Sequence, residues 1–255
     1  MLADFGAEAS FQAATLRVKE HYGVLVPISA LRQQTLRHGR AITALADPQK
    51  ARAATQLITE MDGSMIPVME PGGGHDRRKG KRLFWREVKL CCARPVGSVQ
   101  TRYGATLGNA TTAGWLWQEV ARSAGLHPQT RVHGLGDGAR WILEQFTSNF
   151  GEQRTYLVDF YHVSDYLAAA QTRVSPGQAK PWLHRQQGRL LNNQLGKVLR
   201  TLHPHQEPEG TPEAPVQTAY RYRSERADSL DYQTRAKCGT RLHDIGLCGR
   251  PARSK

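Results

Sequence analysis

The chain has 255 residues, 39% of them hydrophobic, which is enough for one sizeable domain and a smaller one. Its 35 Lys and Arg outnumber its 22 Asp and Glu, and the formal charge of +13 indicates a polyanionic partner, most commonly nucleic acid. A ribosome-associated or unselectively basic protein is the alternative. The sequence has no apolar run of membrane-spanning length, no signal-peptide pattern at its start, and no zinc-site or disulfide spacing among its four cysteines. These features predict a cytoplasmic protein without a membrane partner.

Residues 1–45 predict a small helical region. A helical stripe of apolar residues is followed by a break that contains Gly and Pro, and Ser29 is a candidate N-cap for the helix that follows. That helix carries Arg32, Arg37 and Arg40. A helix, a glycine-containing turn and a basic helix outline a helix-turn-helix, so these arginines are candidate DNA contacts. A role in packing or oligomerisation is the alternative.

After a polar, alanine-rich segment at 46–56, which predicts a linker or a short helix at a domain boundary, the pattern changes to strands. The expected elements are strands at 57–69, 84–96 and 99–107, a helix at 111–124, a strand at 131–135, a helix at 139–150, a strand at 155–161 and a helix beginning at 163–170. Adjacent strands followed by βαβ alternation predict an α/β fold, with a ribonuclease H-like mixed sheet flanked by helices over residues 57–175.

An acid followed by glycine occurs at two of the apolar runs, as Asp62-Gly63 and Asp137-Gly138. Burying an acid in an apolar strand is costly unless its charge is compensated. Strands one and four are neighbours in a ribonuclease H-like sheet, so the two carboxylates would face each other and would repel unless a cation lay between them. Mg²⁺ or Mn²⁺ suits such oxygen ligands, and two ions roughly 4 Å apart can drive in-line phosphodiester cleavage and strand transfer.

The two glycines predict turns that bring the backbone close to a phosphate, because glycine adopts angles that other residues avoid. For either pair alone, an ordinary turn at a strand end is the alternative.

Asp159 and His162 form an Asp-x-x-His step on the last expected strand. Asp159 is a candidate third ligand, and His162 could orient it or contact DNA. The alternative is that Asp159 caps the helix that follows and that His162 is half-buried.

A strongly basic loop lies between the first two expected strands. Five of its six residues from 77 to 82 are basic, and such a hairpin tip would follow a phosphate backbone. A solvated loop is the alternative. The candidate DNA contacts here are Arg77, Arg78, Lys79, Lys81 and Arg82.

Residues 176–237 predict a helical and proline-rich extension. Leucines at helical spacing indicate a helix over Trp182–Leu202, and the four prolines in 203–215 indicate an irregular segment. The tail at 238–255 is basic and has no apolar period.

At these residues the chain resembles bacterial insertion-sequence transposases of the Mutator-related DDE superfamily, in particular the Kra-type group. The resemblance covers most of residues 4–232. It is carried by Asp4-Phe-Gly-Ala-Glu, Glu20-His-Tyr-Gly-Val, Met61-Asp-Gly-Ser-Met-Ile-Pro, Arg86-Glu-Val-Lys, Gly136-Asp-Gly-Ala-Arg-Trp-Ile, Val158-Asp-Phe-Tyr-His-Val, Leu190-Leu-Asn-Asn-Gln-Leu and Leu230-Asp-Tyr.

The resemblance implies a DDE catalytic triad, Mg²⁺ dependence and binding to double-stranded DNA at the terminal inverted repeats of a mobile element. It identifies Asp62 and Asp137 as the first two catalytic acids, and Asp159 with His162 as the family's Asp/Cys-x-x-His step. Because relatives act as multimers on paired DNA ends, it also implies a homo-oligomer on DNA, in the bacterial cytoplasm at the nucleoid.

The chain departs from the family pattern at its third acid. In the family this acid is a Glu in a Gly-Ser-Gly…Glu-Ser segment shortly after the Leu-Asp-Tyr stretch, whereas here no Glu follows Glu225. Asp244 could substitute, but only its charge supports this. We therefore expect a truncated or frameshifted copy, with weak or absent strand-transfer activity.

Two other functions fit the sequence. One is a non-catalytic DNA-binding remnant whose acids are vestigial, and the other is a cellular nuclease of ribonuclease H-like fold that has no preference for terminal repeats. Metal binding that is lost in Asp62→Ala and Asp137→Ala would favour the transposase over the remnant.

Overall fold

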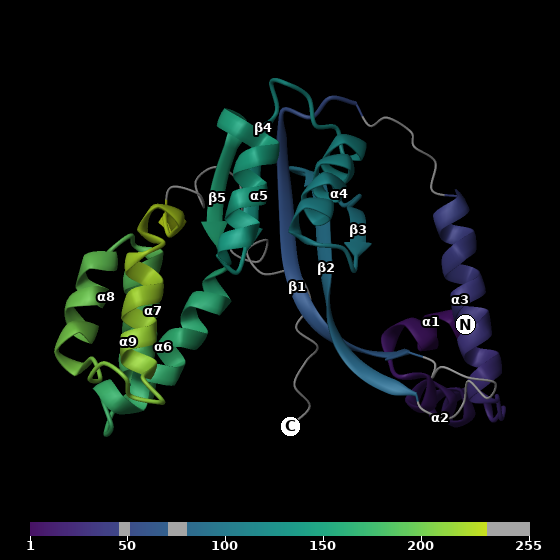
Figure 1. Cartoon of the computed structure of the whole chain (residues 1–255), viewed down its shortest axis with the longest axis horizontal. Helices are drawn as coiled ribbons and strands as arrows, with labels where there is room; N and C mark the ends of the chain where they lie inside the picture. Colours follow the sequence, from purple (N-terminus) through teal and green to yellow (C-terminus); the bar gives the residue numbers. More distant parts are fainter. Residues whose placement is uncertain (46–51, 71–80, 234–255) are drawn as a thin grey trace. The chain divides into compact units, whose positions relative to one another are not determined.

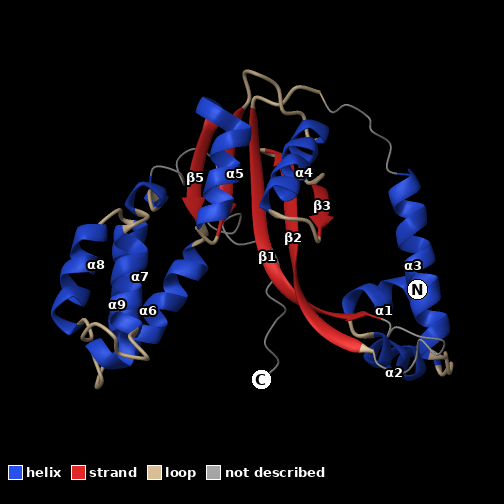
Figure 2. Cartoon of the chain, in the orientation of Figure 1, coloured by secondary structure: helices blue, strands red, loops and turns tan. Residues whose placement is uncertain are grey.

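The computed structural model describes residues 1–45, 52–70 and 81–233, and the chain divides into two compact units, Met1–Gln49 and Lys50–Lys255. The described residues of the first unit form three helices, α1 (Leu2–Glu8), α2 (Phe11–Tyr22) and α3 (Ile28–Leu45). Figure 1 colours the chain by sequence, and Figure 2 colours it by secondary structure. Ala14, Val18 and Leu31 form the buried core of this unit.

Local signals explain where α2 begins and ends. The Ser10 hydroxyl accepts a hydrogen bond from the Ala13 N–H at 3.3 Å, and Gly23 ends the helix in a left-handed conformation with φ 68°. The expected N-cap of the next helix was wrong, because α3 begins at Ile28 and Ser29 lies within its first turn. A helix-turn-helix role for α2 and α3 stays a prediction.

The second unit is built on a five-stranded mixed sheet in the order β3-β2-β1-β4-β5. Its strands are β1 (Gln56–Glu70), β2 (Arg82–Pro95), β3 (Arg102–Thr106), β4 (Arg131–Gly136) and β5 (Arg154–Val158). The pairs β1–β2 and β2–β3 are antiparallel, whereas β1–β4 and β4–β5 are parallel. This arrangement is compatible with a ribonuclease H-like fold, and it confirms that the first and fourth strands are neighbours.

Helices α4 (Ala110–Ser123) and α5 (Arg140–Phe150) cover one face of the sheet (Figure 2). Alternation along β1 explains the packing, because Leu57, Thr59 and Met61 are all buried. The Trp117 indole N–H donates to the Thr59 hydroxyl, which satisfies two buried polar groups. Phe146 and Phe150 of α5 pack against Trp117, with ring centroids 5.3 and 5.5 Å away.

Beyond the β5 edge lie the helices α6 (Phe160–Val174), α7 (Ala179–Leu191), α8 (Leu195–Leu202) and α9 (Pro215–Ser224) (Figure 1). Three short 3-10 turns, Gly151–Gln153, His203–His205 and Ala227–Ser229, complete the elements of the described chain. The single helix expected over Trp182–Leu202 was wrong. The chain breaks it at residues 192–194, where Asn193 has φ 53°, and this break turns the helix into the pair α7 and α8.

One hydrophobic cluster joins the sheet to these helices. It includes Leu135 and Val158 of the sheet as well as Leu167, Leu190 and Leu202 of the helices. Residues of the extension therefore belong to the same core as the sheet that carries the acids.

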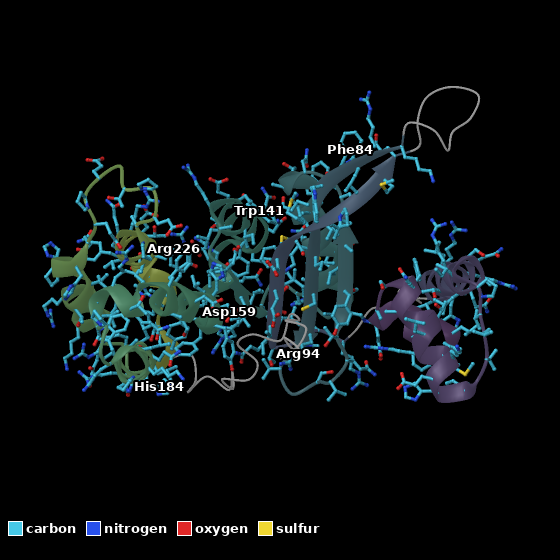
Figure 3. All side chains as sticks on the ribbon, turned by 90° about the horizontal axis from the view of Figure 1, so that it is seen from below. Phe84, Arg94, Trp141, Asp159, His184 and Arg226 are labelled. Carbon is cyan, nitrogen blue, oxygen red and sulfur yellow. The ribbon has the colours of Figure 1, made fainter. Side chains whose placement is uncertain are left out.

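Strands β1 and β2 continue as a two-stranded arm past the rest of the sheet. β1 pairs with β4 only over residues 56–60, whereas its pairing with β2 runs on to Glu70 and Arg82. Figure 3 shows Phe84 far out on this arm. The loop that joins the two strands, residues 71–80, lies outside the described residues.

Candidate active site

Asp62 lies inside a continuous strand, which corrects the expectation of a turn at Asp62-Gly63. Asp62 is paired with Leu90 of β2, and Gly63 with Lys89. The Gly63 N–H donates to Asp62 Oδ1 at 2.8 Å, which fixes one oxygen of the carboxylate. Gly63 leaves room for the Glu87 side chain, because a Cβ at this position would make the flexible Glu87 carboxylate move aside.

Asp137 follows the last residue of β4 and lies next to Asp62. The last parallel pair between the two strands joins Glu60 to Leu135, so Asp62 and Asp137 occupy matched positions two residues further on and share a face of the sheet. Asp137 belongs to a turn, as the sequence predicts: Gly138 has φ 77°, and the Ala139 N–H donates to Asp137 Oδ1 at 2.7 Å. The structure thus brings the two acid-glycine pairs together, although one pair is extended in a strand and the other forms a turn.

The pKa of Asp62 reflects its closeness to Asp137. Burial raises the pKa of the Asp62 carboxyl above its ordinary value, and the negative charges of Asp137 and Glu87 raise it further. The Gly63 N–H and the nearby His162 act in the opposite direction and favour the charged form. A half-buried carboxylate that is repelled by a neighbouring acid is a site at which a cation would be favoured.

Asp159 caps a helix, as one of the two interpretations of the sequence predicts, whereas its role as a third ligand stays a prediction. The last strand was expected to reach residue 161, but β5 ends at Val158 and Asp159 is the N-cap of α6. Its Oδ1 accepts the Tyr161 N–H at 2.8 Å, and its own N–H donates to the Gly136 carbonyl at 2.8 Å. Asp159, labelled in Figure 3, therefore lies beside the end of β4, because its backbone bonds to Gly136, and one of its carboxylate oxygens forms the cap.

His162 is partly buried on the first turns of α6, and its charge acts on Asp62. Its ring packs edgewise against Tyr166 and Tyr222, with centroids 5.3 and 5.7 Å away. Of the four candidate catalytic residues, the structure groups Asp62, Asp137 and His162 electrostatically, whereas Asp159 supports the adjoining helix.

The carboxylates fit Mg²⁺ in part. Asp62 and Asp137 supply the oxygen ligands that this ion prefers. Within residues 1–45, 52–70 and 81–233, however, no three His, Cys, Asp or Glu side chains lie close enough together to hold a metal ion. The described chain therefore offers a two-carboxylate site, and the third acid of a triad is not found in it.

Sequence reasoning missed Glu87. This half-buried acid forms an ion pair with the Lys89 ammonium at 2.7 Å, and its charge acts on Asp62. Lys89 lies in turn 5.5 Å from the centre of the Trp141 ring. The only sequence signal was the stretch Arg86-Glu-Val-Lys, whose place beside Asp62 depends on the register between β1 and β2.

Sequence reasoning also missed two residues from the end of the extension. The Tyr222 hydroxyl donates to the Asp137 carbonyl, and the Arg226 Nε donates to the Gly138 carbonyl at 2.8 Å. No local pattern indicates these contacts, because 85 and 88 residues separate the partners.

The candidate DNA contacts fall into three groups. Arg32, Arg37 and Arg40 are exposed on α3 of the first unit, and Lys81 and Arg82 are exposed where β2 begins. Arg77, Arg78 and Lys79 lie outside the described residues.

The arm of β1 and β2 presents apolar side chains to solvent. Residues paired across antiparallel strands share a face, so one face of the arm carries Met65, Pro67, Met69, Leu83 and Trp85. Trp85 is 61% exposed.

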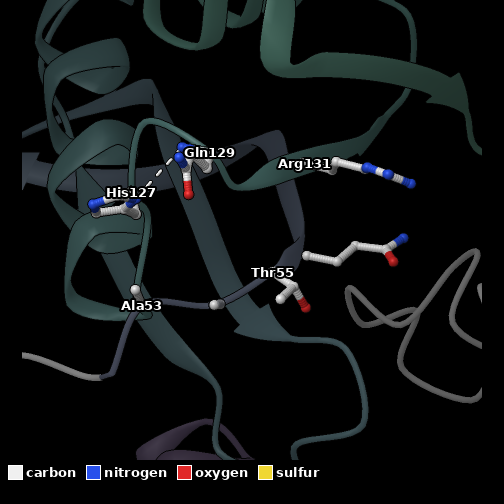
Figure 4. Close-up of a pocket in the computed structure, with 7 residues that line it drawn as sticks. Ala53, Thr55, His127, Gln129 and Arg131 are labelled. Carbon is white, nitrogen blue, oxygen red and sulfur yellow. Dashed lines mark hydrogen bonds between the residues drawn. The ribbon is translucent and has the colours of Figure 1, made fainter.

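A pocket of about 470 Å³ lies at the opposite end of the central strands (Figure 4). It is lined by residues 53–56 at the start of β1 and by His127, Gln129 and Arg131 at the start of β4. Asp62 lies six positions after Gln56, a distance of about 20 Å along a strand. The pocket is therefore not part of the acidic site.

Comparisons with known proteins are sparse. No family model and no curated protein matches the chain. Among solved structures, a Drosophila P element transposase strand transfer complex is similar at 10% identity and a TM-score of 0.39, covering 99% of this chain and 74% of that chain. No helix in the described part of the chain is long and apolar enough to cross a membrane.

Proposed function

We propose that the chain is a transposase of the DDE type, which cleaves and joins insertion-sequence DNA with Mg²⁺ or Mn²⁺. The observation that carries the proposal is the meeting of Asp62 and Asp137 on one face of two adjacent parallel strands, close enough for one charge to raise the pKa of the other. The resemblance of the segments around Asp62, Asp137 and Asp159 to insertion-sequence transposases supports the same function.

Asp62 and Asp137 would hold the ions. When bound by these two carboxylates, Mg²⁺ would supply activation of a hydroxyl on one side of a phosphorus and stabilisation of the leaving oxygen on the other. The residues around them set the geometry: the Gly63 and Ala139 N–H groups each hold one oxygen of a catalytic carboxylate at a fixed position. Asp159 holds the start of α6, which places His162 near Asp62.

The exposed basic residues would bind the DNA ends, as a homo-oligomer on paired terminal repeats. Phosphate contacts by Lys and Arg position a protein on DNA and make its affinity fall with salt. The exposed Arg32, Arg37 and Arg40 of α3 and the exposed Lys81 and Arg82 of β2 are the described candidates.

Manganese binding tests this function directly. Electron paramagnetic resonance of free Mn²⁺ should show binding to the full chain, and the binding should be lost in Asp62→Asn and in Asp137→Asn. Asp228→Asn is the matched control, because Asp228 is an exposed acid in the turn after α9. Unaltered Mn²⁺ binding in both site variants would contradict the proposal.

Strand transfer by the purified chain is expected to be weak or absent, because no third acid is found among the described residues. An assay with labelled terminal-repeat DNA and Mg²⁺ measures it. Robust Mg²⁺-dependent cleavage of element ends would show that this expectation is wrong.

The lack of a third acid among the described residues also favours a second candidate, a DNA-binding remnant that performs no chemistry. In that case DNA affinity would be unchanged in Asp62→Ala and Asp137→Ala, and the chain would bind no Mn²⁺. Metal binding therefore separates the two candidates.

A further inference from the structure

Two side chains from the end of the helical extension hold the turn that carries Asp137. The Tyr222 hydroxyl, on α9, donates to the Asp137 carbonyl, and the Nε of Arg226 donates to the Gly138 carbonyl at 2.8 Å. Both backbone carbonyls of the acid-glycine pair therefore accept hydrogen bonds from one short segment, residues 222–226. We call these two side chains the α9 pair.

The turn is packed directly against the α9 pair. Gly138 has φ 77°, a conformation that favours glycine, and a Cβ there would lie 2.9 Å from Arg226 Cδ and 3.0 Å from the Tyr222 hydroxyl oxygen. The Gly138 N–H faces the Tyr156 hydroxyl from the sheet side at 3.4 Å. Contacts from two elements thus fix the turn that follows β4.

The α9 pair is itself immobilised. The Arg226 guanidinium lies over the Tyr222 ring, 4.2 Å from its centre, and only 18% of the Arg226 side chain is exposed. Tyr222 stacks in turn on Tyr166 of α6, with ring centroids 4.2 Å apart and planes at 25°. Because α6 also carries His162, one aromatic stack connects the α9 pair to the residue whose charge acts on Asp62.

In this turn, the position of the backbone determines the position of the Asp137 carboxylate. Asp137 Oδ1 accepts the N–H of Ala139 at 2.7 Å, so the carboxylate follows the backbone of the turn. A shift of the Gly138 carbonyl would therefore move the acid away from its partner on β1. Residues that orient metal ligands in this way commonly affect metal affinity without touching the metal.

We propose that Tyr222 and Arg226 are positioning residues that hold the Asp137 carboxylate opposite Asp62. The metal-binding part of this inference rests on the proposed function, whereas the part that concerns the turn does not. The inference gives the helical extension a role at the candidate site, although Tyr222 lies 85 residues after Asp137 in the sequence.

The test compares Tyr222→Phe, Arg226→Met and Arg226→Lys in the full chain, with Arg221→Met as a control from the exposed side of the same helix. Two quantities are measured: the Mn²⁺ dissociation constant, and the hydrogen-exchange rate of the Ala139 amide in metal-free protein. The second reports the bond to the Asp137 carboxylate and needs no metal. Thermal unfolding is recorded for every variant.

Arg226→Met should weaken Mn²⁺ binding about tenfold and should speed exchange at Ala139. Arg226→Lys keeps a cation over the Tyr222 ring and should recover part of both effects, while Arg221→Met should match the wild type. If Arg226→Met does not fold, Tyr222→Phe, which removes a single oxygen, carries the comparison.

Wild-type exchange at Ala139 together with wild-type Mn²⁺ affinity in both Tyr222→Phe and Arg226→Met would overturn the inference. So would a loss of thermal stability that leaves both quantities unchanged, because that pattern shows a purely structural role. If the wild type binds no Mn²⁺, the proposed function fails, and exchange at Ala139 alone then decides the role of the α9 pair.

Discussion

The two acid-glycine pairs of this chain have the same sequence and different structures. Asp62-Gly63 is extended within β1, with both residues paired to β2. Asp137-Gly138 is a turn with a left-handed glycine, held by Tyr156 of the sheet, by Tyr222 of α9 and by Arg226, which follows α9. The comparison teaches that the dipeptide favours no one backbone by itself, and that the strand or helix packed against it decides between a strand and a turn.

The largest difference in stability is expected between the alanine variants of the two glycines, Gly63 and Gly138. Gly138→Ala forces a Cβ into a left-handed residue and against Arg226, and we expect a loss of about 3 kcal/mol in the free energy of unfolding. Gly63→Ala meets only the far end of the flexible Glu87 side chain and should cost about 1 kcal/mol or less. Urea unfolding of both variants measures the difference. Equal losses would show that the two glycines are not distinguished by their backbones.

A loss of stability of intermediate size is expected at the end of β5, the strand that pairs with β4. The buried Tyr232 hydroxyl donates to the Val158 carbonyl at 2.9 Å, next to the cap formed by Asp159. Tyr232→Phe leaves that carbonyl without this donor and should cost about 1–2 kcal/mol. Thermal and urea unfolding check this value. Tyr161→Phe is the control, because Tyr161 is an exposed tyrosine of the same neighbourhood and should change little.

The smallest expected effect concerns the repulsion between the two acids. Because its pKa is raised on folding, the charged form of Asp62 disfavours the folded state. This penalty is absent below the ordinary pKa of 3.8, grows as the pH rises from there to the folded pKa, and is constant above it. Asp62→Asn in metal-free protein should therefore stabilise the fold at neutral pH by about 0.5 kcal/mol, since solvent screens a half-buried group. The gain should vanish near pH 3 in unfolding experiments.

A double-mutant cycle sharpens this comparison. Asp137→Asn removes the same repulsion from the other side, so the stabilisation in Asp62→Asn/Asp137→Asn should fall short of the sum of the single variants. Strict additivity would place the two carboxylates too far apart to share a cation.

Much of the fold could be predicted because its elements have strong local signals. Alternating and continuous apolar runs give the five strands, and apolar residues at helical spacing give α4. The errors lie where neighbours decide the outcome. The helix over Trp182–Leu202 breaks at residues 192–194, where the Asn193 amide also bonds to Asp231 of a distant segment. The strand expected to reach residue 161 stops at Val158, where Asp159 caps α6.

The candidate site could be predicted only in its two acids and in His162. Asp62 and Asp137 follow from the apolar runs that carry them and from the strand order of the fold. Glu87, Tyr222 and Arg226 have no comparable signal, because each reaches the site through strand register or helix packing.

The sequence alone determined most of the elements, the strong positive charge and the presence of an acid-glycine pair in two apolar runs, since hydrophobic period and charge are properties of the residues themselves. Only the tertiary structure decided that one acid-glycine pair is a strand and the other a turn, and which distant side chains surround them. The physical reason is that an extended or a left-handed glycine costs little in isolation, so pairing to β2 in one case, and contacts with Tyr156 and Arg226 in the other, select the backbone.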